Sequence, residues 1–543
     1  MPRLPVTVSS QNRGMPEVSR RRFLQSVGVS GGAGALFATM GALGLAPAAA
    51  AAAPAYRAPQ RSDFALTGRS GKRVIVLGGG IAGLTTAYEL GKAGYDCTVL
   101  EAREVAGGRN FTVRRGTTQT DLDGQKQRAA FSPGIYLNAG PARIAQWMVT
   151  LDYCRELGVP VEPFVNANAD ALIYNEAAGM QPGHPVRYRT AKADVYGYVA
   201  ELLAKATDQG ALDAQLTAAD KERLLSFLQG FGAIGGRTAD WAYAGSSRRG
   251  FASYPGAGND VGVPLDGPGP LADVFASNVG RYFSFEFGYD QAMMMFQPVG
   301  GMDRIPAALA RAVGHGRIKL GAEVASVTDR ADAVEVSYRQ DGRTRTVTAD
   351  FCVAALPPHL MARVPHNLGA QVQAALGSFP VTPSGKIGLE YRSRWWENDL
   401  RIYGGITETD LDLAHIWYPS HDFHAPRGLI VGYYNTGQAA RTYGALTPQQ
   451  RVERAVEQGV KIHGEKYRSE LTTAFSVAWH RTPYLEGAWT SPPWGSAAYN
   501  RLLEPSGRVY FAGDWLSHEV AWQHGAFVSA RSVVTALHRR VLS

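Results

Sequence analysis

The sequence predicts an α/β fold in which a parallel sheet with its helices is interleaved with a second domain built on an antiparallel sheet. Two observations carry this prediction. Val74–Leu77 is an apolar, mostly β-branched run before a glycine-rich turn, as expected of a parallel strand buried on both faces. Strand-like segments at residues 386–391, 401–403, 414–418 and 429–434 then follow one another, which favours an antiparallel sheet.

The glycine-rich turn fits a dinucleotide-binding fingerprint. Gly78, Gly80 and Gly83 have the G-x-G-x-x-G spacing; the first permits a tight turn, the second lets the backbone approach a pyrophosphate, and the third packs helix on strand. The following helix would aim free N–H groups at phosphate. A second strand, 97–100, ends in Glu101, which lies 21 positions after Gly80 and suits ribose hydroxyls. The fingerprint leaves open whether the nucleotide is NAD or FAD.

The first 53 residues differ from the rest of the chain. Ser19-Arg-Arg-Arg-Phe-Leu-Gln25 precedes a Gly/Ala-rich, moderately apolar run and then Ala-Pro-Ala-Ala-Ala, which resembles a twin-arginine export signal. Residues 26–45 hold six glycines, two serines and a threonine, a poor composition for a stable membrane span. We therefore expect a secreted protein with no stable membrane anchor after cleavage of the signal.

Charge and cysteine content exclude several classes of protein. The 543-residue chain has a formal net charge of +8, and its first 53 residues carry five arginines and one glutamate, so the mature chain keeps about +4. That is too little to predict binding to nucleic acid or an anionic membrane. Cys97, Cys154 and Cys352 are an odd number and imply no disulfide framework. His421 and His424 lack a third ligand cluster and favour a polar loop, so we expect no metal.

Three further motifs narrow the class of protein. They are Gly107-Gly108-Arg109, Tyr136-Leu-Asn-Ala-Gly-Pro-Ala-Arg143 and, near the C-terminus, Phe511-Ala-Gly-Asp514. With these motifs, residues 72–543 resemble the FAD-dependent amine oxidases and, within them, the L-amino acid oxidases; Met295–Pro306 is a further marker of that family. The resemblance implies a Rossmann-like FAD-binding domain of the glutathione-reductase type 2, interleaved with an α+β substrate domain. It also favours FAD over NAD, and because no cysteine is near the terminal motif, FAD is expected to be noncovalent.

The resemblance also implies a set of cofactor-binding residues. Arg109 is expected near the pyrophosphate, Val324 at the adenine, and Asp514, where the family more often has Glu, near the ribityl phosphate. The helix after Trp522 would donate N–H groups to the flavin C2 oxygen. The full set is Gly78, Gly80, Ala82, Gly83, Glu101, Arg103, Gly108, Arg109, Gly140, Arg143, Val324, Trp479, Gly513, Asp514, Trp522 and Ala526.

The expected catalytic residues are Arg143, Tyr433 and Lys386. By resemblance, Arg143 forks onto the substrate carboxylate, as a planar guanidinium can, and Tyr433 donates its phenol to the same carboxylate. Lys386 would hold a water against flavin N5, where a buried cation favours electron transfer to dioxygen.

Further residues are expected around the substrate. Trp479 and Trp522 would wall the flavin and the reacting amine, and the carbonyl of Ala521, at a position where relatives have Gly, would accept the amine. Trp489 and Asn435 stand at side-chain pocket positions that are aliphatic in relatives, so the preferred amino acid stays open. The substrate-binding set is Arg143, Tyr433, Trp489, Ala521 and Trp522.

The activity implied by the resemblance is oxidative deamination of an L-amino acid. Hydride transfer from Cα to flavin N5 would lead to a 2-oxo acid and ammonia, with dioxygen reduced to hydrogen peroxide. A decarboxylating amino-acid 2-monooxygenase or an amine oxidase would share most of these motifs. A secreted flavoprotein without turnover is a third alternative, and a homodimer is open.

The expected organisation follows from these motifs and from the helical patterns at 144–157 and 190–230. Residues 1–53 would be the signal and 54–70 a linker. The FAD-binding domain would comprise 71–150, 296–362 and 491–543, and the substrate domain 151–295 and 363–490. Residues 245–270, rich in Gly, Pro and Asp, would form a long loop.

Overall fold

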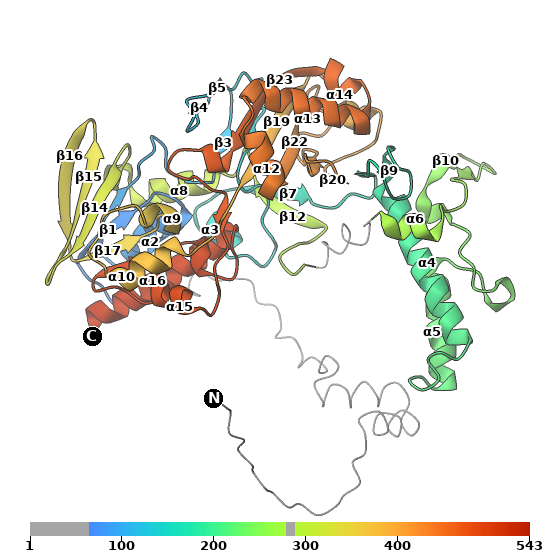
Figure 1. Ribbon diagram of the computed structural model, residues 1–543, viewed down its shortest axis with the longest axis horizontal. Helices are drawn as coiled ribbons and strands as arrows, with labels where there is room; N and C mark the ends of the chain where they lie inside the picture. Colours follow the sequence, from blue (N-terminus) through green and yellow to red (C-terminus); the bar gives the residue numbers. More distant parts are fainter. Residues whose placement is uncertain (1–63, 278–287) are drawn as a thin grey trace, which may run out of the picture. The chain divides into compact units, whose positions relative to one another are not determined.

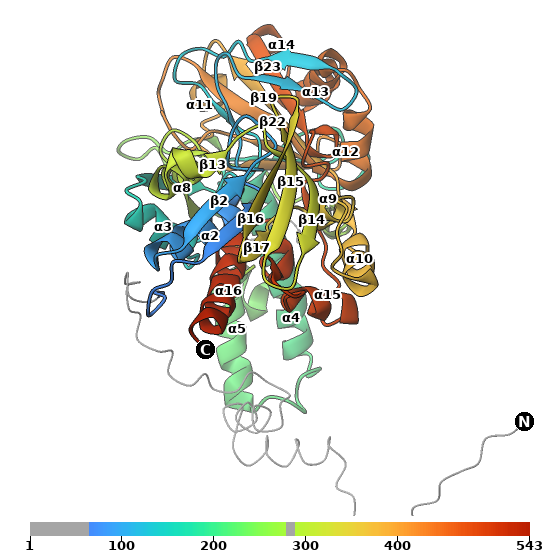
Figure 2. The same ribbon diagram turned by 90° about the vertical axis from the view of Figure 1, so that its left-hand side faces the viewer.

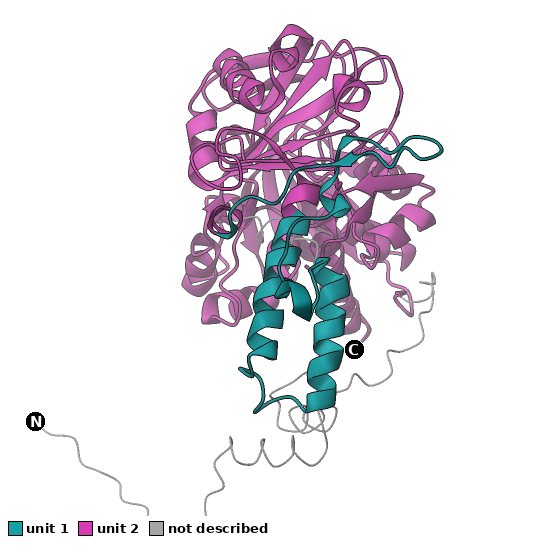
Figure 3. Cartoon of the chain, turned by 90° about the vertical axis from the view of Figure 1, so that its right-hand side faces the viewer, with its two compact units in different colours: residues 1–57, 192–271 teal, residues 58–191, 272–543 magenta. Residues whose placement is uncertain are grey.

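The computed structural model describes residues 64–277 and 288–543. The expected export signal and residues 54–63 of the expected linker lie outside these ranges. The described residues divide into two compact units, a smaller one of residues 192–271 and a larger one of residues 64–191, 272–277 and 288–543 (Figure 3). No helix within the described ranges is long and apolar enough to cross a membrane.

The larger unit contains the predicted parallel sheet, with strand order β13-β2-β1-β17-β25. Figure 1 labels β1 and β17 of this sheet. The strands are β1 (Arg73–Leu77), β2 (Asp96–Leu100), β13 (Ile318–Lys319), β17 (Phe351–Ala354) and β25 (Val509–Phe511). All neighbouring pairs are parallel. The sheet therefore joins segments from three distant parts of the sequence, as the interleaved organisation requires.

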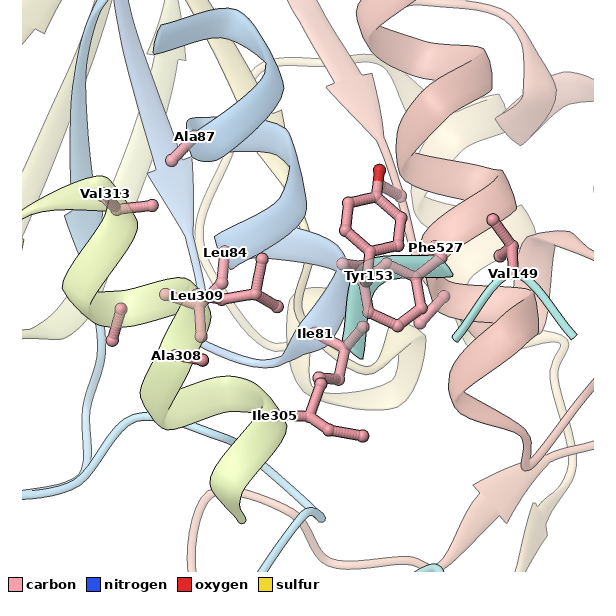
Figure 4. Packing of buried hydrophobic residues seen from close by; sticks show 14 of the residues in the cluster. Ile81, Leu84, Ala87, Val149, Tyr153, Ile305, Ala308, Leu309, Val313 and Phe527 are labelled. Atoms are coloured by element: carbon pink, nitrogen blue, oxygen red, sulfur yellow. The ribbon is translucent and has the colours of Figure 1, made fainter. Parts of the chain in front are cut away.

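Both faces of this sheet are covered, which explains why β1 is apolar at consecutive positions. Val74 and Val76 pack in one cluster with residues of α2 (Ile81–Lys92), α8 (Arg304–Val313) and α16 (Gln523–Leu542). Figure 4 shows this packing, with Leu84 of α2 and Leu309 of α8 near Ile81 and Ile305. Burial of such aliphatic side chains contributes about 1.5–3 kcal/mol each.

On the other face, Ile75 and Leu77 belong to a second cluster. It includes residues of the antiparallel sheet β14 (Glu323–Asp329), β15 (Val334–Gln340) and β16 (Arg343–Ala349), which Figure 2 shows beside β17. Helices α10 (Ala370–Gly377) and α15 (Ala497–Leu503) complete it. Residues 370–377, which we expect in the substrate domain, thus pack with the parallel sheet instead.

The predicted antiparallel sheet has seven strands in the order β23-β19-β22-β21-β20-β8-β9. They are β8 (Leu172–Tyr174), β9 (Val186–Arg187), β19 (Ser384–Tyr391), β20 (Ile406–Thr409), β21 (His415–Trp417), β22 (Gly428–Thr436) and β23 (Leu471–Ala478). All pairs are antiparallel except β8 with β20, which is parallel.

The strand expected at 401–403 is wrong. Arg401, Gly404 and Gly405 have φ values of 56°, 72° and 91°, which end any extended run, and the strand begins at Ile406 instead. The helix expected over 144–157 is also too long, because α3 covers only Thr150–Glu156. Ile144 forms an antiparallel bridge with Phe296, so its burial comes from strand pairing and not from a helical face.

Shorter elements complete the larger unit. The two-stranded pairs are β3 (Thr112–Val113) with β6 (Leu137–Asn138), β4 (Thr118–Thr120) with β5 (Lys126–Arg128), β7 (Val161–Val165) with β12 (Met294–Pro298), and β18 (Val381–Thr382) with β24 (Trp489–Thr490). The remaining helices are α6 (Leu271–Ala276), which begins at the unit boundary, α9 (Pro358–Met361), α11 (Trp395–Asn398), α12 (Gly437–Gly444), α13 (Pro448–His463) and α14 (Lys466–Ser469).

The smaller unit is built on two helices, α4 (Tyr188–Asp208), which begins just before it, and α5 (Ala218–Gly232), as the helical patterns predict. The loop expected at 245–270 holds one short hairpin, β10 (Phe251–Ser253) with β11 (Val263–Pro264). The smaller unit contains a buried ion pair, in which Arg249 donates from Nε to Asp194 Oδ1 at 2.7 Å. The hydroxyl of Tyr243 donates to the same oxygen at 2.9 Å.

Candidate active site

Within the larger unit, most of the predicted site residues line one cavity of about 790 Å³. It opens at the carboxyl ends of β1, β2 and β17, where ligands of parallel α/β sheets bind, and extends to the antiparallel sheet. The predicted residues that line it are Gly78, Gly80, Ala82, Glu101, Gly108, Arg109, Gly140, Arg143, Val324, Lys386, Trp479, Trp489, Gly513, Asp514, Ala521, Trp522 and Ala526.

The glycines of the first turn have the conformations that a dinucleotide site needs. Gly78 has φ +96°, and a Cβ there would lie 3.0 Å from the carbonyl oxygen of Ala355. Gly80 faces open space, since a Cβ there would meet nothing within 4 Å. Gly83 does not line the cavity; a Cβ there would lie 1.9 Å from the carbonyl oxygen of Gly78. Gly83 therefore permits close packing of helix on strand, as the fingerprint predicts.

Helix α2 begins at the cavity with uncapped N–H groups. Its N-cap is Gly80, which provides no side-chain hydrogen bond, and the first turn holds no acidic residue. Ile81 and Ala82 line the cavity at this end. The first N–H groups of a helix lack partners within the helix and carry its positive dipole end, so this terminus suits an anionic phosphate.

Glu101 is held by backbone groups at the end of β2. Its Oε2 accepts from the N–H of Gly79 at 2.7 Å and its Oε1 from the N–H of Arg103 at 2.9 Å. Burial raises the pKa of Glu101, and these hydrogen bonds oppose that rise. Arg103 itself does not line the cavity; it donates to the carbonyl of Gly108 at 2.8 Å. The structure thus gives Arg103 a role in shaping the second glycine turn.

The second glycine turn meets the C-terminal motif through an ion pair. Arg109 donates from Nη2 to Asp514 Oδ1 at 2.7 Å and from Nη1 to the carbonyl of Ala488 at 2.6 Å. The other oxygen of Asp514 accepts from the N–H of Ala521 at 3.0 Å. Ala521 has φ 68°, a left-handed conformation that costs a residue with a Cβ about 1–2 kcal/mol. The Asp514 carboxylate therefore ties three segments together at the cavity wall.

Lys386 is a buried cation whose partners are neutral. Its Nζ donates to the carbonyl oxygen of Gly140 at 2.6 Å and lies 4.7 Å from the ring centroids of Trp417 and Tyr434. Burial, reinforced by the charge of Arg143, lowers the pKa of Lys386 to about 7. At neutral pH the amine can therefore gain or lose a proton when charge nearby changes.

Arg143 lies on the same wall as Lys386. Its Nη1 donates to Asn166 Oδ1 at 2.8 Å, and the guanidinium stacks 4.8 Å over the ring of Trp417. Burial lowers its pKa, while Tyr434 and two acids, Glu408 and Asp290, oppose that change. A guanidinium in these surroundings can bind a carboxylate strongly, because little water competes.

The placement of Tyr433 at the substrate is wrong, and Tyr434 lines the cavity in its place. Lys386 of β19 pairs with Tyr434 of β22, whereas Tyr433 pairs with Ile387 and is fully buried in the core of the antiparallel sheet. Paired residues on neighbouring strands point to the same face of the sheet, and successive residues along a strand point to opposite faces. A shift of one residue therefore moves a side chain from the cavity to the core. The side chain of Tyr433 packs 4.4 Å from the ring of Tyr443.

Asn435 is also turned from the cavity. Its side chain is buried and donates from Nδ2 to the carbonyl of Asp412 at 3.0 Å, so it does not shape the side-chain pocket. Trp489 does line the cavity, and so do Trp479 and Trp522. Trp479 donates from Nε1 to the carbonyl of Ala139 at 3.0 Å, which fixes the ring beside the Gly140 turn.

Besides Tyr434, sequence reasoning missed Trp417, Asp290 and Gln291 at the substrate end, all of which line the cavity. Alternation along β21 could have indicated Trp417, since it shares a sheet face with Lys386 and Tyr434. Asp290 and Gln291 come from the segment before β12, and no sequence pattern marks them. Trp522 donates from Nε1 to Asp290 Oδ2 at 3.1 Å.

The fold and the cavity together define a dinucleotide-binding protein of the α/β class with a cationic, aromatic site at the far end of the nucleotide cleft. The profile of the flavin containing amine oxidoreductases matches residues 81–538, and the chain belongs to that family. The family implies a flavin cofactor and a small-molecule amine or amino-acid substrate.

Curated relatives agree with this assignment, and a solved structure shares the fold. The chain is 26% identical to the putative L-amino-acid oxidase YobN of Bacillus subtilis over 482 residues, which covers 86% of this chain and 95% of that protein. It is 26% identical to an L-amino-acid oxidase of Vipera ammodytes ammodytes, covering 86% and 93%. The cyclohexylamine oxidase of Brevibacterium oxydans IH-35A has the same fold, with a TM-score of 0.58, 17% identity and coverage of 87% and 100%.

Proposed function

We propose that this protein is an L-amino acid oxidase that uses noncovalently bound FAD to convert an L-amino acid and dioxygen to a 2-oxo acid, ammonia and hydrogen peroxide. The observation that carries the proposal is the placement of the Arg143 guanidinium beside Tyr434 and Lys386 on the wall of the dinucleotide cavity. A simple amine offers no group for this cationic wall, whereas the carboxylate of an amino acid does. The names of the curated relatives support the same substrate class.

The residues present fit FAD. The uncapped start of α2 and the open space at Gly80 suit the pyrophosphate, and Glu101 lies where ribose hydroxyls would reach a carboxylate. A second uncapped helix, α16, begins after Trp522 at the other end of the cavity, with no acid in its first turn. Its N–H groups would stabilise negative charge on a flavin ring.

The positions of the cysteines support noncovalent binding. Cys97, Cys154 and Cys352 are all buried and free, and none lines the cavity. Burial raises the pKa of Cys97 and of Cys154 to about 12, so neither is a thiolate at neutral pH. Acid precipitation of the purified protein should therefore release all of its flavin into the supernatant, where mass spectrometry identifies it as FAD. Flavin retained in the pellet would contradict noncovalent binding.

The chain's own residues would bind and orient the amino acid. Arg143 would hold the substrate carboxylate with two parallel N–H donors, and the hydroxyl of Tyr434 would donate to the same group. Trp522 and Trp479 would confine the reacting amine and exclude water from it. Bound FAD would supply the chemistry by accepting the Cα hydride and passing the electrons to dioxygen. Lys386 would place a positive charge beside the reduced cofactor during that second step.

Anaerobic reduction of the purified flavoprotein tests the proposal. L-Amino acids should bleach the flavin absorbance, and in air the products should be a 2-oxo acid and hydrogen peroxide in equal amounts. In the wild type, amines that lack a carboxylate should reduce the flavin far more slowly than L-amino acids do. An amide product would indicate a decarboxylating monooxygenase instead, and a flavin that no L-amino acid reduces would indicate a binding protein.

The Arg143→Met variant sharpens this test. Loss of a charged hydrogen-bond donor pair should lower kcat/KM for L-amino acids by about 10- to 100-fold, while the rate with amines lacking a carboxylate stays the same or rises. An equal loss for both substrate classes would contradict the carboxylate role of Arg143.

We also propose that the protein is exported through the twin-arginine route. The pattern of residues 19–25 and the low hydrophobicity of residues 26–45 support this. Replacement of Arg20, Arg21 and Arg22 by Lys should retain the protein inside the cell with its signal uncleaved, as N-terminal mass spectrometry of the two fractions would show. Unchanged export of this variant would contradict the proposal.

A further inference from the structure

We propose that Asp290 recognises a positively charged side chain, so that the preferred substrates are L-amino acids with a basic side chain such as lysine or ornithine. This inference rests on the function proposed above and names the substrate class of the same cavity. It follows from the charges that line the cavity, where one carboxylate has no cationic partner among the residues that the structure describes.

Five carboxylates line the cavity, namely Glu101, Asp290, Glu323, Glu486 and Asp514. Three of them have an arginine partner within the protein. Asp514 pairs with Arg109 at 2.7 Å, Glu486 with Arg363 at 2.6 Å, and Glu323 with Arg339 at 3.1 Å. Glu101 instead accepts two backbone N–H groups at the nucleotide end. These four carboxylates are therefore satisfied by the protein itself.

Asp290 differs from the other four. Its Oδ2 accepts from the indole N–H of Trp522 at 3.1 Å and from the Nε2 of Gln291 at 3.3 Å, both neutral donors. Within residues 64–277 and 288–543, no lysine, arginine or histidine lies within 4.0 Å of its carboxylate, and Oδ1 accepts no hydrogen bond. A half-buried carboxylate in this setting gains most from a cation supplied by the ligand.

The position of Asp290 is fixed by its neighbours. Trp147 donates from Nε1 to the carbonyl of Tyr289 at 2.7 Å, and the two rings stack 5.4 Å apart. Asn166, which holds Arg143, also donates to Gln291 Oε1 at 3.4 Å. The residues on both sides of Asp290 are thus attached to the walls of the substrate end, so the carboxylate is preorganised for a ligand.

The opposite charges of the cavity match a basic amino acid. Arg143 and Lys386 supply the positive wall for the α-carboxylate, and Asp290 supplies a negative group that is electrostatically coupled to Arg143. Trp522 also lines this end, and an aromatic face attracts an ammonium or guanidinium group. A neutral aliphatic side chain would leave the Asp290 carboxylate desolvated without a partner, which costs affinity.

Substrate discrimination in the Asp290→Asn variant tests this inference. L-Norleucine has the carbon chain of L-lysine without the terminal amine, so the ratio of kcat/KM for lysine to that for norleucine isolates the charged group. We expect wild type to prefer lysine and Asp290→Asn to lower the ratio by about 10- to 100-fold, because kcat/KM falls for lysine and rises for norleucine, whose side chain no longer leaves a carboxylate without a partner. Asp332→Asn, which removes an exposed charge elsewhere, should leave the ratio unchanged.

Binding of inert analogues gives a second readout that does not depend on turnover. 6-Aminohexanoate and hexanoate both lack the α-amine, and their binding can be followed by perturbation of the flavin absorbance. Asp290→Asn should weaken binding of 6-aminohexanoate by about 10-fold or more and should not weaken binding of hexanoate. A folding defect would weaken both ligands together and would be seen as a lower melting temperature.

Three outcomes would overturn the inference or its basis. If wild type oxidises norleucine but shows no preference for lysine, the inference about Asp290 fails while the proposed function stands. If Asp290→Asn lowers kcat equally for both substrates and shifts the pH profile, the carboxylate acts on the α-amine and the inference fails. If no L-amino acid reduces the flavin, the proposed function itself fails.

Discussion

Arg109 and Asp514 lie 405 positions apart in the sequence, and the guanidinium of Arg109 donates to the carboxylate of Asp514 at 2.7 Å on the wall of the cavity. The contact joins the second glycine turn to the turn after β25. Because the side chain of Asp514 is mostly buried and that of Arg109 partly so, the pair is less screened than a surface ion pair.

Replacement of Arg109 by Met should therefore weaken flavin binding. Loss of a charged hydrogen bond at this site corresponds to about 1.5–3 kcal/mol, or a roughly 10- to 100-fold higher dissociation constant. Release of flavin fluorescence on dilution measures this change. Arg114→Met breaks a comparable ion pair with Asp303 at 2.6 Å that does not line the cavity, and it should leave flavin affinity unchanged.

Ala521→Gly should stabilise the protein. Ala521 has φ 68°, and glycine adopts that conformation without the steric cost of a Cβ. After the greater freedom of glycine in the unfolded chain is subtracted, a gain of about 0.5–1 kcal/mol in the free energy of unfolding remains. Ala536→Gly, at an exposed site inside α16, should instead destabilise by about 1 kcal/mol. Denaturant unfolding compares the two, and a loss in both would contradict strain at Ala521.

Lys386 should make stability depend on pH. Its folded pKa of about 7 lies below its usual 10.5, so the unfolded chain binds more protons between these values and stability rises with pH across the window. The slope should approach about 1.4 kcal/mol per pH unit. Lys386→Met removes this contribution, so its stability advantage over wild type should be greatest at pH 7 and below and should fall toward pH 10.5.

A second substitution checks the cause of this shift. The charge of Arg143 adds to burial in lowering the pKa of Lys386. Arg143→Met should therefore raise the folded pKa of Lys386, which is the lower limit of the pH range over which stability rises. Denaturant titrations of the wild type, Lys386→Met and Arg143→Met at several pH values give the comparison. An unmoved lower limit would mean that burial alone lowers the pKa.

The neighbours Tyr433 and Tyr434 offer a matched pair of substitutions. Tyr434→Phe removes a hydroxyl from the cavity wall and should raise KM for an L-amino acid by about 10-fold. Tyr433→Phe alters the core of the antiparallel sheet and should change the melting temperature while KM stays within about 2-fold of wild type. The reverse pattern in steady-state kinetics would restore Tyr433 as the substrate residue.

Much of the nucleotide end could be predicted from the sequence, because local geometry fixes it. Gly78, Gly80 and Glu101 belong to one strand, turn, helix and strand unit, whose spacing follows from the pyrophosphate and ribose that it would hold. The structure places these residues on the cavity and gives Gly83 the packing role expected of it. Arg103 is the exception, because it supports the turn at Gly108 and does not itself line the cavity.

The substrate end could be predicted only in part. A strand exchanges its two faces at each residue, so Tyr433 and Tyr434 are indistinguishable until the register against Lys386 is known. That register includes an irregularity between the pairs Ile387 with Tyr433 and Gly388 with Val431, which no local pattern specifies. Asp290 belongs to an irregular segment with no periodicity at all.

The sequence by itself determined that the chain has a dinucleotide-binding α/β domain and, through its motifs, its family. Those features are local, since a turn of fixed spacing needs only its own residues. Only the tertiary structure decided which side chains meet at the far end of the cavity. There Arg143, Lys386, Tyr434 and Asp290 come from four separate segments, and the pairing of distant strands, which is set by burial of one face against the core, brings them together.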